Sequence, residues 1–152
     1  MINKLFFAIA IAVLSSSAAA ISDEQAVETC LVAASQKYSV NYYLLKAVLK
    51  TEGGYRGAAR ENKNGSFDYG WAQTNSIHLP MLQQYGITKE KLMYDPCYSI
   101  GTMAWMLASE LSKAAPGADG FWQAVGNYHS KTPKHNLKYR KLVWKNLNAL
   151  GV

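Results

Sequence analysis

The chain has 152 residues, of which 49% are hydrophobic and 17% are charged, so it is large enough for one domain with a single buried core. It contains 16 Lys and Arg against 10 Asp and Glu, which gives a formal net charge of +6. A basic surface fits an anionic partner, but the sequence has no nucleic-acid-binding motif and no dense Lys/Arg patch with base-stacking aromatics. Nucleic acid is therefore not the expected partner.

Residues 1–20 are predicted to be a signal peptide rather than part of the fold. Lys4 gives a positively charged start, Leu5 to Leu14 is apolar, and Ala18-Ala19-Ala20 is a plausible cleavage site. The apolar run is shorter than the roughly 20 residues of a membrane-spanning helix, although a retained N-terminal anchor is the alternative. The mature domain would cover residues 21–152, exported and without a stable membrane span.

The first helix of the mature domain is predicted from Ser22 to Gln36, with Ser22 or Asp23 as its cap. It carries Cys30, one of two cysteines in the chain; the other is Cys97. In an exported protein such a pair is most simply a disulfide, and two unpaired buried thiols are the alternative. No Cys-His arrangement and no His-Glu-X-X-His spacing occurs, so neither a catalytic thiol nor a metal site is expected.

A second helix is predicted to end at Glu52. Helical spacing places Leu45, Val48, Leu49 and Glu52 on one face, and Gly53-Gly54 ends the helix. The carboxylate would lie at the edge of an apolar surface and at the negative end of the helix dipole, so we expect a raised pKa. A neutral acid near pH 7 can donate a proton to a leaving group. The alternative is a surface glutamate that merely ends a helix.

A short β-hairpin is predicted after this helix. Residues 62–70 are rich in turn-forming residues, and Asn64-Gly65 is a strong hairpin signal. The hairpin would bring Asp68 back opposite Glu52. Two carboxylates in different environments across a cleft are the usual equipment for cleaving glycosidic bonds.

The chain resembles the specialised lytic transglycosylases of the lysozyme superfamily, which accompany bacterial secretion systems, conjugation machines and pili. Their motifs are Glu-Ser-X-X, Gly-Leu-Met-Gln and Ala-Tyr-Asn. The matching segments here occur in the same order and span nearly the whole mature chain: Glu52-Gly53-Gly54, Gly70-Trp71-Ala72-Gln73 and Gly126-Asn127-Tyr128. Gly53 stands where the family has Ser, Trp71-Ala72 replaces Leu-Met, and Asn127 and Tyr128 are in swapped order. Asp68-Tyr69-Gly70 also resembles animal-type lysozymes, in which the Asp assists hydrolysis.

The resemblance implies a substrate-binding trough beside the two carboxylates. Gln73 is a candidate to hydrogen-bond a sugar substituent, or else a buried amide that ties the hairpin to the core. Tyr69 and Trp71 would stack on sugar faces, or else pack in the core, which is the default for aromatic side chains. By resemblance, Tyr128 would hydrogen-bond Glu52 and Asn127 would contact substrate; the alternative is a Tyr packed at a helix end with its hydroxyl in solvent.

Three longer helices are predicted in the second half of the chain. Asp95-Pro96 opens a central buried helix to about Ala115, the next runs from Gly120 to about Tyr128, and Thr132-Pro133 starts a basic last helix to about Leu150. The predicted fold is mainly α and lysozyme-like, a single domain with a small β-hairpin beside the cleft. No cofactor is expected.

Three functions fit this sequence. The first, which the resemblance favours, is a peptidoglycan lytic transglycosylase that cleaves between N-acetylmuramic acid and N-acetylglucosamine with 1,6-anhydro product formation. The others are a lysozyme-type muramidase that uses Asp68 directly, and a non-catalytic peptidoglycan-binding assembly protein. The expected location is the periplasm of a Gram-negative bacterium. The expected partners are glycan strands and components of a secretion, conjugation or pilus apparatus, and the protein is expected to be a monomer.

Overall fold

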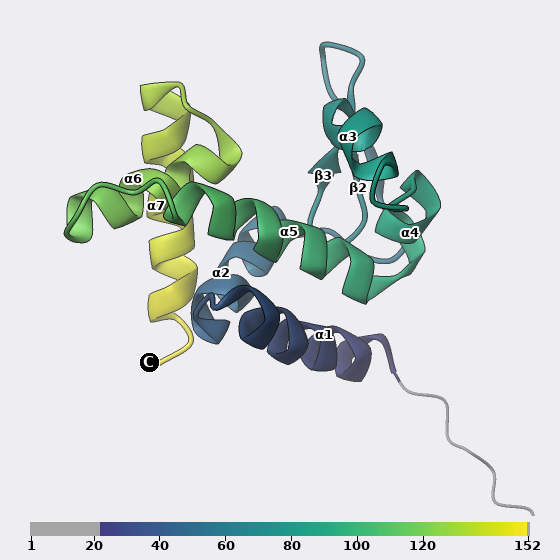
Figure 1. Cartoon of the computed structure of the whole chain (residues 1–152), viewed down its shortest axis with the longest axis horizontal. Coiled ribbons are helices and arrows are strands. Elements are labelled where there is room, and N and C mark those ends of the chain that lie inside the picture. Colours follow the sequence, from purple (N-terminus) through teal and green to yellow (C-terminus); the bar gives the residue numbers. More distant parts are fainter. Residues whose placement is uncertain (1–21, 152) are drawn as a thin grey trace, which may run out of the picture.

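A computed structural model describes residues 22–151 of the chain, so the predicted signal peptide lies outside the described residues. Within this range the fold is mainly helical with a small antiparallel sheet, as predicted (Figure 1). In chain order its elements are α1 (Asp23–Tyr38), α2 (Tyr42–Glu52), β1 (Ala59–Glu61), β2 (Phe67–Tyr69), β3 (Thr74–Asn75), a 3₁₀ turn (Ser76–His78), α3 (Leu79–Gln83), α4 (Lys89–Tyr94), α5 (Pro96–Leu111), α6 (Ala118–His129) and α7 (Pro133–Asn148).

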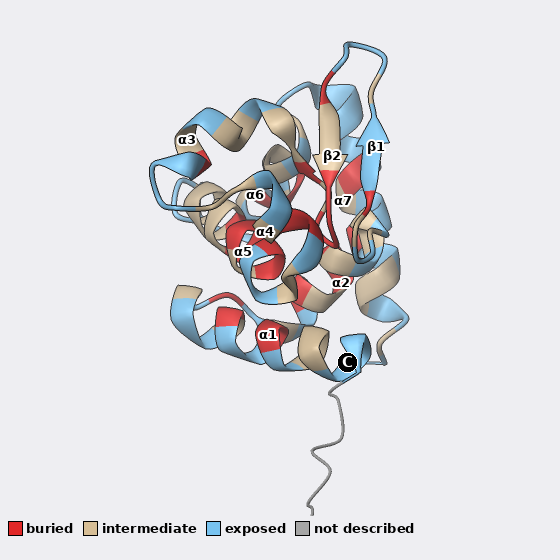
Figure 2. Cartoon of the chain, turned by 90° about the vertical axis from the view of Figure 1, so that its right-hand side faces the viewer, coloured by how far each residue is buried: buried red, intermediate tan, exposed pale blue. Residues whose placement is uncertain are grey.

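Helix α5 is the centre of the domain. Figure 1 shows α6 and α7 gathered at one end of α5, with the sheet, α3 and α4 at the other, and α1 alongside it. Its fully buried apolar residues are Ile100, Met103, Ala104 and Leu107, which recur at helical spacing, and Ser99 is fully buried with them. Asp95 caps the helix by accepting hydrogen bonds from the backbone N–H groups of Cys97 and Tyr98. Figure 2 shows many of the buried residues gathered at and around α5.

Helix α5 ends at Leu111, four residues before the predicted end near Ala115. Pro116 has no backbone N–H to bond the carbonyl four residues earlier, and its ring would clash with that carbonyl. The helix therefore ends before the turn that leads to Pro116, and α6 follows from Gly117, whose φ of 91° suits glycine.

A disulfide joins α1 to the first turn of α5. It pairs Cys30 with Cys97 over a sequence separation of 67, and the Cα atoms are 4.8 Å apart, so the predicted bridge is confirmed. The bridge lies beside a buried face of α1 that includes Leu31 and Ala34. By closing a long loop, it should stabilise the fold by roughly 4 kcal/mol in the chain-entropy model.

The hairpin forms as predicted, and a third strand extends it. β1, β2 and β3 pair antiparallel in that order, and Asp68 lies opposite both Arg60 and Asn75. Gly65, with a φ of 78°, lies in the turn between β1 and β2. Figure 2 shows the hairpin projecting from the domain with an exposed tip.

Helix α7 packs against both α2 and α6, and this contact positions much of the site. Its buried residues are Asn136, Tyr139 and Val143. Gly126 of α6 allows the close approach, because a Cβ there would meet the Asn136 side chain at 2.3 Å. None of the helices within residues 22–151 has both the length and the apolar character needed to cross a membrane.

Candidate active site

A cavity of about 740 Å³ lies between the sheet side of the domain and the α6–α7 side. The hairpin and the segment after it line one side, and the end of α6 and the start of α7 line the other. Helices α2 and α5 contribute Glu52 and Met106. Segments far apart in the sequence therefore meet around the last residue of α2.

Glu52 is held at this point by the way in which α2 ends. Gly53 adopts the left-handed conformation (φ 61°) that ends the helix, as predicted. The guanidinium of Arg60 donates to the carbonyl oxygens of Glu52 (3.4 Å) and Gly53 (2.6 Å), so the helix end is hydrogen-bonded. Gly54 brings the next segment close, because a Cβ there would lie 2.0 Å from the carbonyl oxygen of Gly70.

The side chain of Glu52 accepts a hydrogen bond from Tyr139. The phenol oxygen lies 2.5 Å from Oε1, and Glu52 is partly buried whereas Tyr139 is buried. Burial and the nearby Glu52 raise the pKa of Tyr139 well above its ordinary value, so the phenol stays protonated and acts as the donor. A second hydrogen bond ties the same helices together, from Asn146 Nδ2 to Thr51 Oγ1 (2.9 Å).

Tyr139 corrects the role that the resemblance implied for Tyr128. Within residues 22–151, the hydroxyl that donates to Glu52 belongs to Tyr139, while Tyr128 lines the same cavity with its ring centroid 6.1 Å from that of Tyr139. Tyr139 lies in a basic stretch of the last helix with no motif around it. Only the packing of α7 on α2 singles it out.

The pKa of Glu52 is raised to about 7, as the sequence predicted, and the main cause is burial. The hydrogen bond from Tyr139 opposes this rise, the charge of Asp68 adds to it, and the charge of Arg60 lowers the pKa. The environment therefore keeps Glu52 largely protonated below neutral pH, and the Tyr139 hydroxyl can stabilise the carboxylate after Glu52 loses its proton.

Asp68 lines the same cavity from the middle of β2. Its Oδ1 accepts a hydrogen bond from Asn75 Nδ2 (2.7 Å), the cross-strand neighbour on β3. The hairpin thus brings the two carboxylates to one cavity, with Asp68 in a polar, hydrogen-bonded setting. This pairing is what the turn-rich segment 62–70 predicted.

Gln73 also lines the cavity, and it adopts an unusual backbone conformation for a residue other than glycine (φ 48°). Its Nε2 donates to the carbonyl oxygen of Gly70 (2.7 Å), so the side chain holds the turn and reaches the cavity at once. The next residue, Thr74, is buried with its Oγ1 unpaired, the one such side-chain atom found within residues 22–151.

Three of the predicted substrate-binding residues lie away from the cavity lining. Tyr69 and Trp71 are only 6% and 7% exposed, and Tyr69 packs with Leu82 and Leu92. Both rings are therefore buried in the core instead of lining the cavity. The side chain of Asn127 accepts a hydrogen bond from Asn136 Nδ2 (2.9 Å) and so joins α6 to α7.

All three histidines of the chain line the cavity: His78, His129 and His135. Burial lowers the pKa of His78 and of His129, so both favour the neutral form. The His129 ring stacks on Tyr139 with centroids 4.5 Å apart. No motif in the sequence singles out His78 or His135 as a cavity residue. No group of three metal-binding side chains gathers in the part of the chain that the structure describes.

This arrangement suits acid–base chemistry on a saccharide. A partly buried acid with a pKa near 7 can protonate a leaving oxygen, and a nearby carboxylate can stabilise positive charge on a sugar ring. The lining also supplies Asn and Gln side chains, which can donate to and accept from sugar hydroxyl and acetamido groups.

Comparison with known proteins gives a consistent result. The model of a family described as "Transglycosylase SLT domain" matches residues 29–146. The chain is 35% identical to "Invasion protein IagB" of Salmonella typhi, over 80% of this chain and 76% of that protein. It is 33% identical to "Protein IpgF" of Shigella flexneri, over 76% and 77% respectively. It is 31% identical to a "Peptidoglycan-binding-like protein" of Escherichia coli O157:H7, over 80% and 79%.

Proposed function

Because the chain belongs to the transglycosylase SLT family, we propose that it is a peptidoglycan lytic transglycosylase with Glu52 as its single acid and base. The observation that carries this proposal is the raised pKa of Glu52, about 7, in a cavity that also contains Asp68. A glutamate with an ordinary pKa would be ionised near pH 7 and would be a poor proton donor.

The proposed reaction breaks the β-1,4 bond between N-acetylmuramic acid and N-acetylglucosamine. Glu52 donates its proton to the glycosidic oxygen as the C1–O bond breaks, and the resulting carboxylate accepts a hydrogen bond from Tyr139. That carboxylate then takes the proton of the muramic C6 hydroxyl while O6 bonds to C1. The products are a 1,6-anhydro end and a free 4-hydroxyl, and Glu52 regains its proton.

Asp68 is proposed to stabilise the positive charge that develops at C1. It lines the same cavity, and its charge already raises the pKa of Glu52. The same observation favours a second candidate, a muramidase, in which Asp68 acts as nucleophile or orients a water molecule. The two mechanisms share the acid and differ in the product.

We further propose that the activity opens the cell wall locally for an envelope-spanning secretion, conjugation or pilus machine. A relative that is named an invasion protein supports this proposal, as does the resemblance of the motifs to specialised transglycosylases. The location that fits is the periplasm of a Gram-negative bacterium. Without Lys4 of the predicted signal peptide, 15 Lys and Arg remain against 10 Asp and Glu, and this excess of about five positive charges would favour binding to an anionic wall.

The test is mass spectrometry of the products released from purified peptidoglycan. Wild type should release anhydromuropeptides, and Glu52→Gln should release none, because the amide keeps the shape of the side chain but has no acidic proton to transfer to the leaving oxygen. Asp68→Asn should keep the anhydro product at a reduced rate. Reducing-end muropeptides would assign the chain to the muramidases instead. Equal products from wild type and Glu52→Gln would reject Glu52 as the acid. No products from either protein would reject the proposed activity and favour a non-catalytic wall-binding role.

A further inference from the structure

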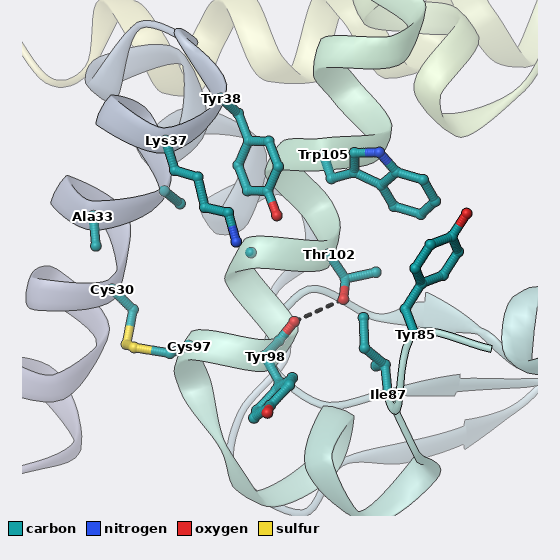
Figure 3. A pocket seen from close by; sticks show the side chains of 12 residues that line it. Cys30, Ala33, Lys37, Tyr38, Tyr85, Ile87, Cys97, Tyr98, Thr102 and Trp105 are labelled. Atoms are coloured by element: carbon teal, nitrogen blue, oxygen red, sulfur yellow. Dashed lines mark hydrogen bonds between the residues drawn. A yellow bond between two sulfur atoms is a disulfide. The ribbon is translucent and has the colours of Figure 1, made fainter. Parts of the chain in front are cut away.

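A second hollow, of about 640 Å³, lies between α1, α5 and the turn after α3 (Figure 3). It shares no lining residue with the cavity around Glu52. Helix α5 separates the two, since Trp105 lines this groove and the next residue, Met106, lines the cavity. The disulfide lies at the edge of the groove and fixes α1 to α5 there.

The groove has aromatic walls that are open to solvent. Tyr38, Tyr85, Tyr98 and Trp105 line it, and Figure 3 shows Tyr85 and Trp105 as neighbours, with ring centroids 5.8 Å apart. Tyr38 and Trp105 pack partly against the core, but Tyr85 is 67% exposed and Tyr98 is 39% exposed, so core packing does not account for these last two rings. Tyr and Trp carry much of the binding energy where proteins bind one another.

The chemistry of the groove differs from that of the cavity around Glu52. The lining also includes the small residues Ala33, Ala34 and Gly101 and the apolar side chain of Ile87. Among the described residues that line it there is no Asp, Glu, Asn or Gln, whereas the cavity around Glu52 is rich in these side chains. A saccharide needs such groups for its hydroxyls, so the lining favours an apolar protein segment over a glycan strand.

The charges at the groove are positive. Lys37 lines it, and Lys91 Nζ lies 4.3 Å from the centroid of the Tyr98 ring, where it donates to the Gly86 carbonyl oxygen (2.8 Å) and to the Tyr98 hydroxyl (3.3 Å). The ion pairs within residues 22–151 are Lys46–Glu28, Arg56–Asp23 and Lys113–Glu110, so neither Lys37 nor Lys91 is neutralised by one of them. Charge complementarity therefore selects an occupant that carries carboxylates.

We propose that this groove is a docking site for an amphipathic protein segment with apolar side chains on one face and acidic side chains at its edge. The apolar side chains would contact the aromatic rings and the small residues of the lining, and the carboxylates would pair with Lys37 and Lys91. The volume suits a few side chains of a helix rather than a whole helix. This function is separate from the proposed reaction and goes beyond it.

Three labelled model helices test the proposal by fluorescence anisotropy with the oxidised, mature chain. They share one Leu/Ala face and carry Glu, Gln or Lys on the other. The Glu helix should bind at least about tenfold more tightly than the Lys helix, and added salt should weaken its binding. Lys37→Glu should weaken binding of the Glu helix by about tenfold. The control Lys141→Glu makes the same charge change at an exposed site on α7, and the affinity for the Glu helix should stay within about twofold of wild type. Tyr85→Ser, at an exposed position, should weaken both the Glu and the Gln helix.

Several outcomes would overturn this assignment, and none of them depends on glycan cleavage. Equal binding of the Glu and Lys helices, or equal effects of Lys37→Glu and Lys141→Glu, would remove the electrostatic argument. Binding of peptide-free glycan strands that is lost in Tyr85→Ser, with no binding of the helices, would make the groove a saccharide site. Self-association that is lost in the same variant would make a second copy of the chain the occupant. Peptidoglycan cleavage by Lys37→Glu should match wild type throughout.

Discussion

Replacing Tyr139 by Phe removes the hydroxyl that donates to Glu52 and little else. The hydrogen bond spans 2.5 Å, and it is the largest influence that lowers the pKa of Glu52. A hydrogen bond to a charged group contributes about 1.5–3 kcal/mol, and 1.36 kcal/mol corresponds to about one pKa unit. Because the phenol also hydrogen-bonds the neutral acid, only part of this energy distinguishes the two forms. We expect the pKa of Glu52 to rise by about one unit above its present value of about 7.

NMR titration of the Glu52 carboxyl carbon measures this pKa directly and does not require activity. Glu52→Gln assigns the signal, and Tyr128→Phe is the matched control, because Tyr128 lines the same cavity but the donor to Glu52 is Tyr139. The rate of muropeptide release gives a second readout. Its basic limb should move up by about one pH unit, and the rate at pH 6 should fall by about tenfold, since the developing carboxylate loses its donor.

A titration midpoint that stays in place or moves down in Tyr139→Phe would refute this reasoning. An upward shift in Tyr128→Phe but not in Tyr139→Phe would restore the role that the resemblance implied for Tyr128. Thermal unfolding of both variants near the wild-type temperature would show that the fold is intact.

Three further predictions concern the carboxylates and the disulfide. The pKa of Glu52 is raised from 4.5 to about 7, so between these pH values the folded state binds a proton that the unfolded state has lost, and the free energy of unfolding falls as pH rises. Glu52→Gln should therefore be more stable than wild type by up to about 3 kcal/mol at pH 8, and the difference should vanish below pH 4.5. A difference in urea unfolding that does not change with pH would contradict this. Asp68→Asn removes a charge that raises the pKa of Glu52, so the titration midpoint of Glu52 should move down, and an unchanged midpoint would mean that the two side chains are not coupled through charge. Replacing Cys30 and Cys97 together by Ala should lower the free energy of unfolding by roughly 4 kcal/mol in denaturant titration, and an unchanged midpoint would mean that the bridge does not constrain the unfolded chain.

The predictable parts of the site come from local sequence signals. Glu52 and its raised pKa follow from the helical spacing of Leu45, Val48 and Leu49 and from the glycines that end α2, because spacing fixes which face is buried. The position of Asp68 near Glu52 follows from the turn residues of a short hairpin, because the pairing of its two strands is set within about a dozen residues. The cap at Asp95-Pro96 is likewise local.

The aromatic and amide residues were harder to assign because their neighbours come from other elements. Tyr69 and Trp71 flank the cavity residues in sequence, yet they pack into the core. Asn127 belongs to a motif that suggested substrate contact, but its side chain bonds Asn136 of the next helix. No pattern within either segment distinguishes a ring or an amide that faces a cavity from one that faces a neighbouring helix.

The family, the mainly helical fold and the pair of carboxylates can all be predicted from the sequence, because motif order, helical periodicity and turn chemistry are properties of short segments. Only the tertiary structure identified Tyr139 as the partner of Glu52, since that contact spans 87 positions in the chain. It depends on the packing of α7 against both α2 and α6, and Gly126 allows that close approach by having no Cβ. The physical reason is that long-range packing depends on the shapes of both surfaces at once, and neither surface is encoded in a single stretch of sequence.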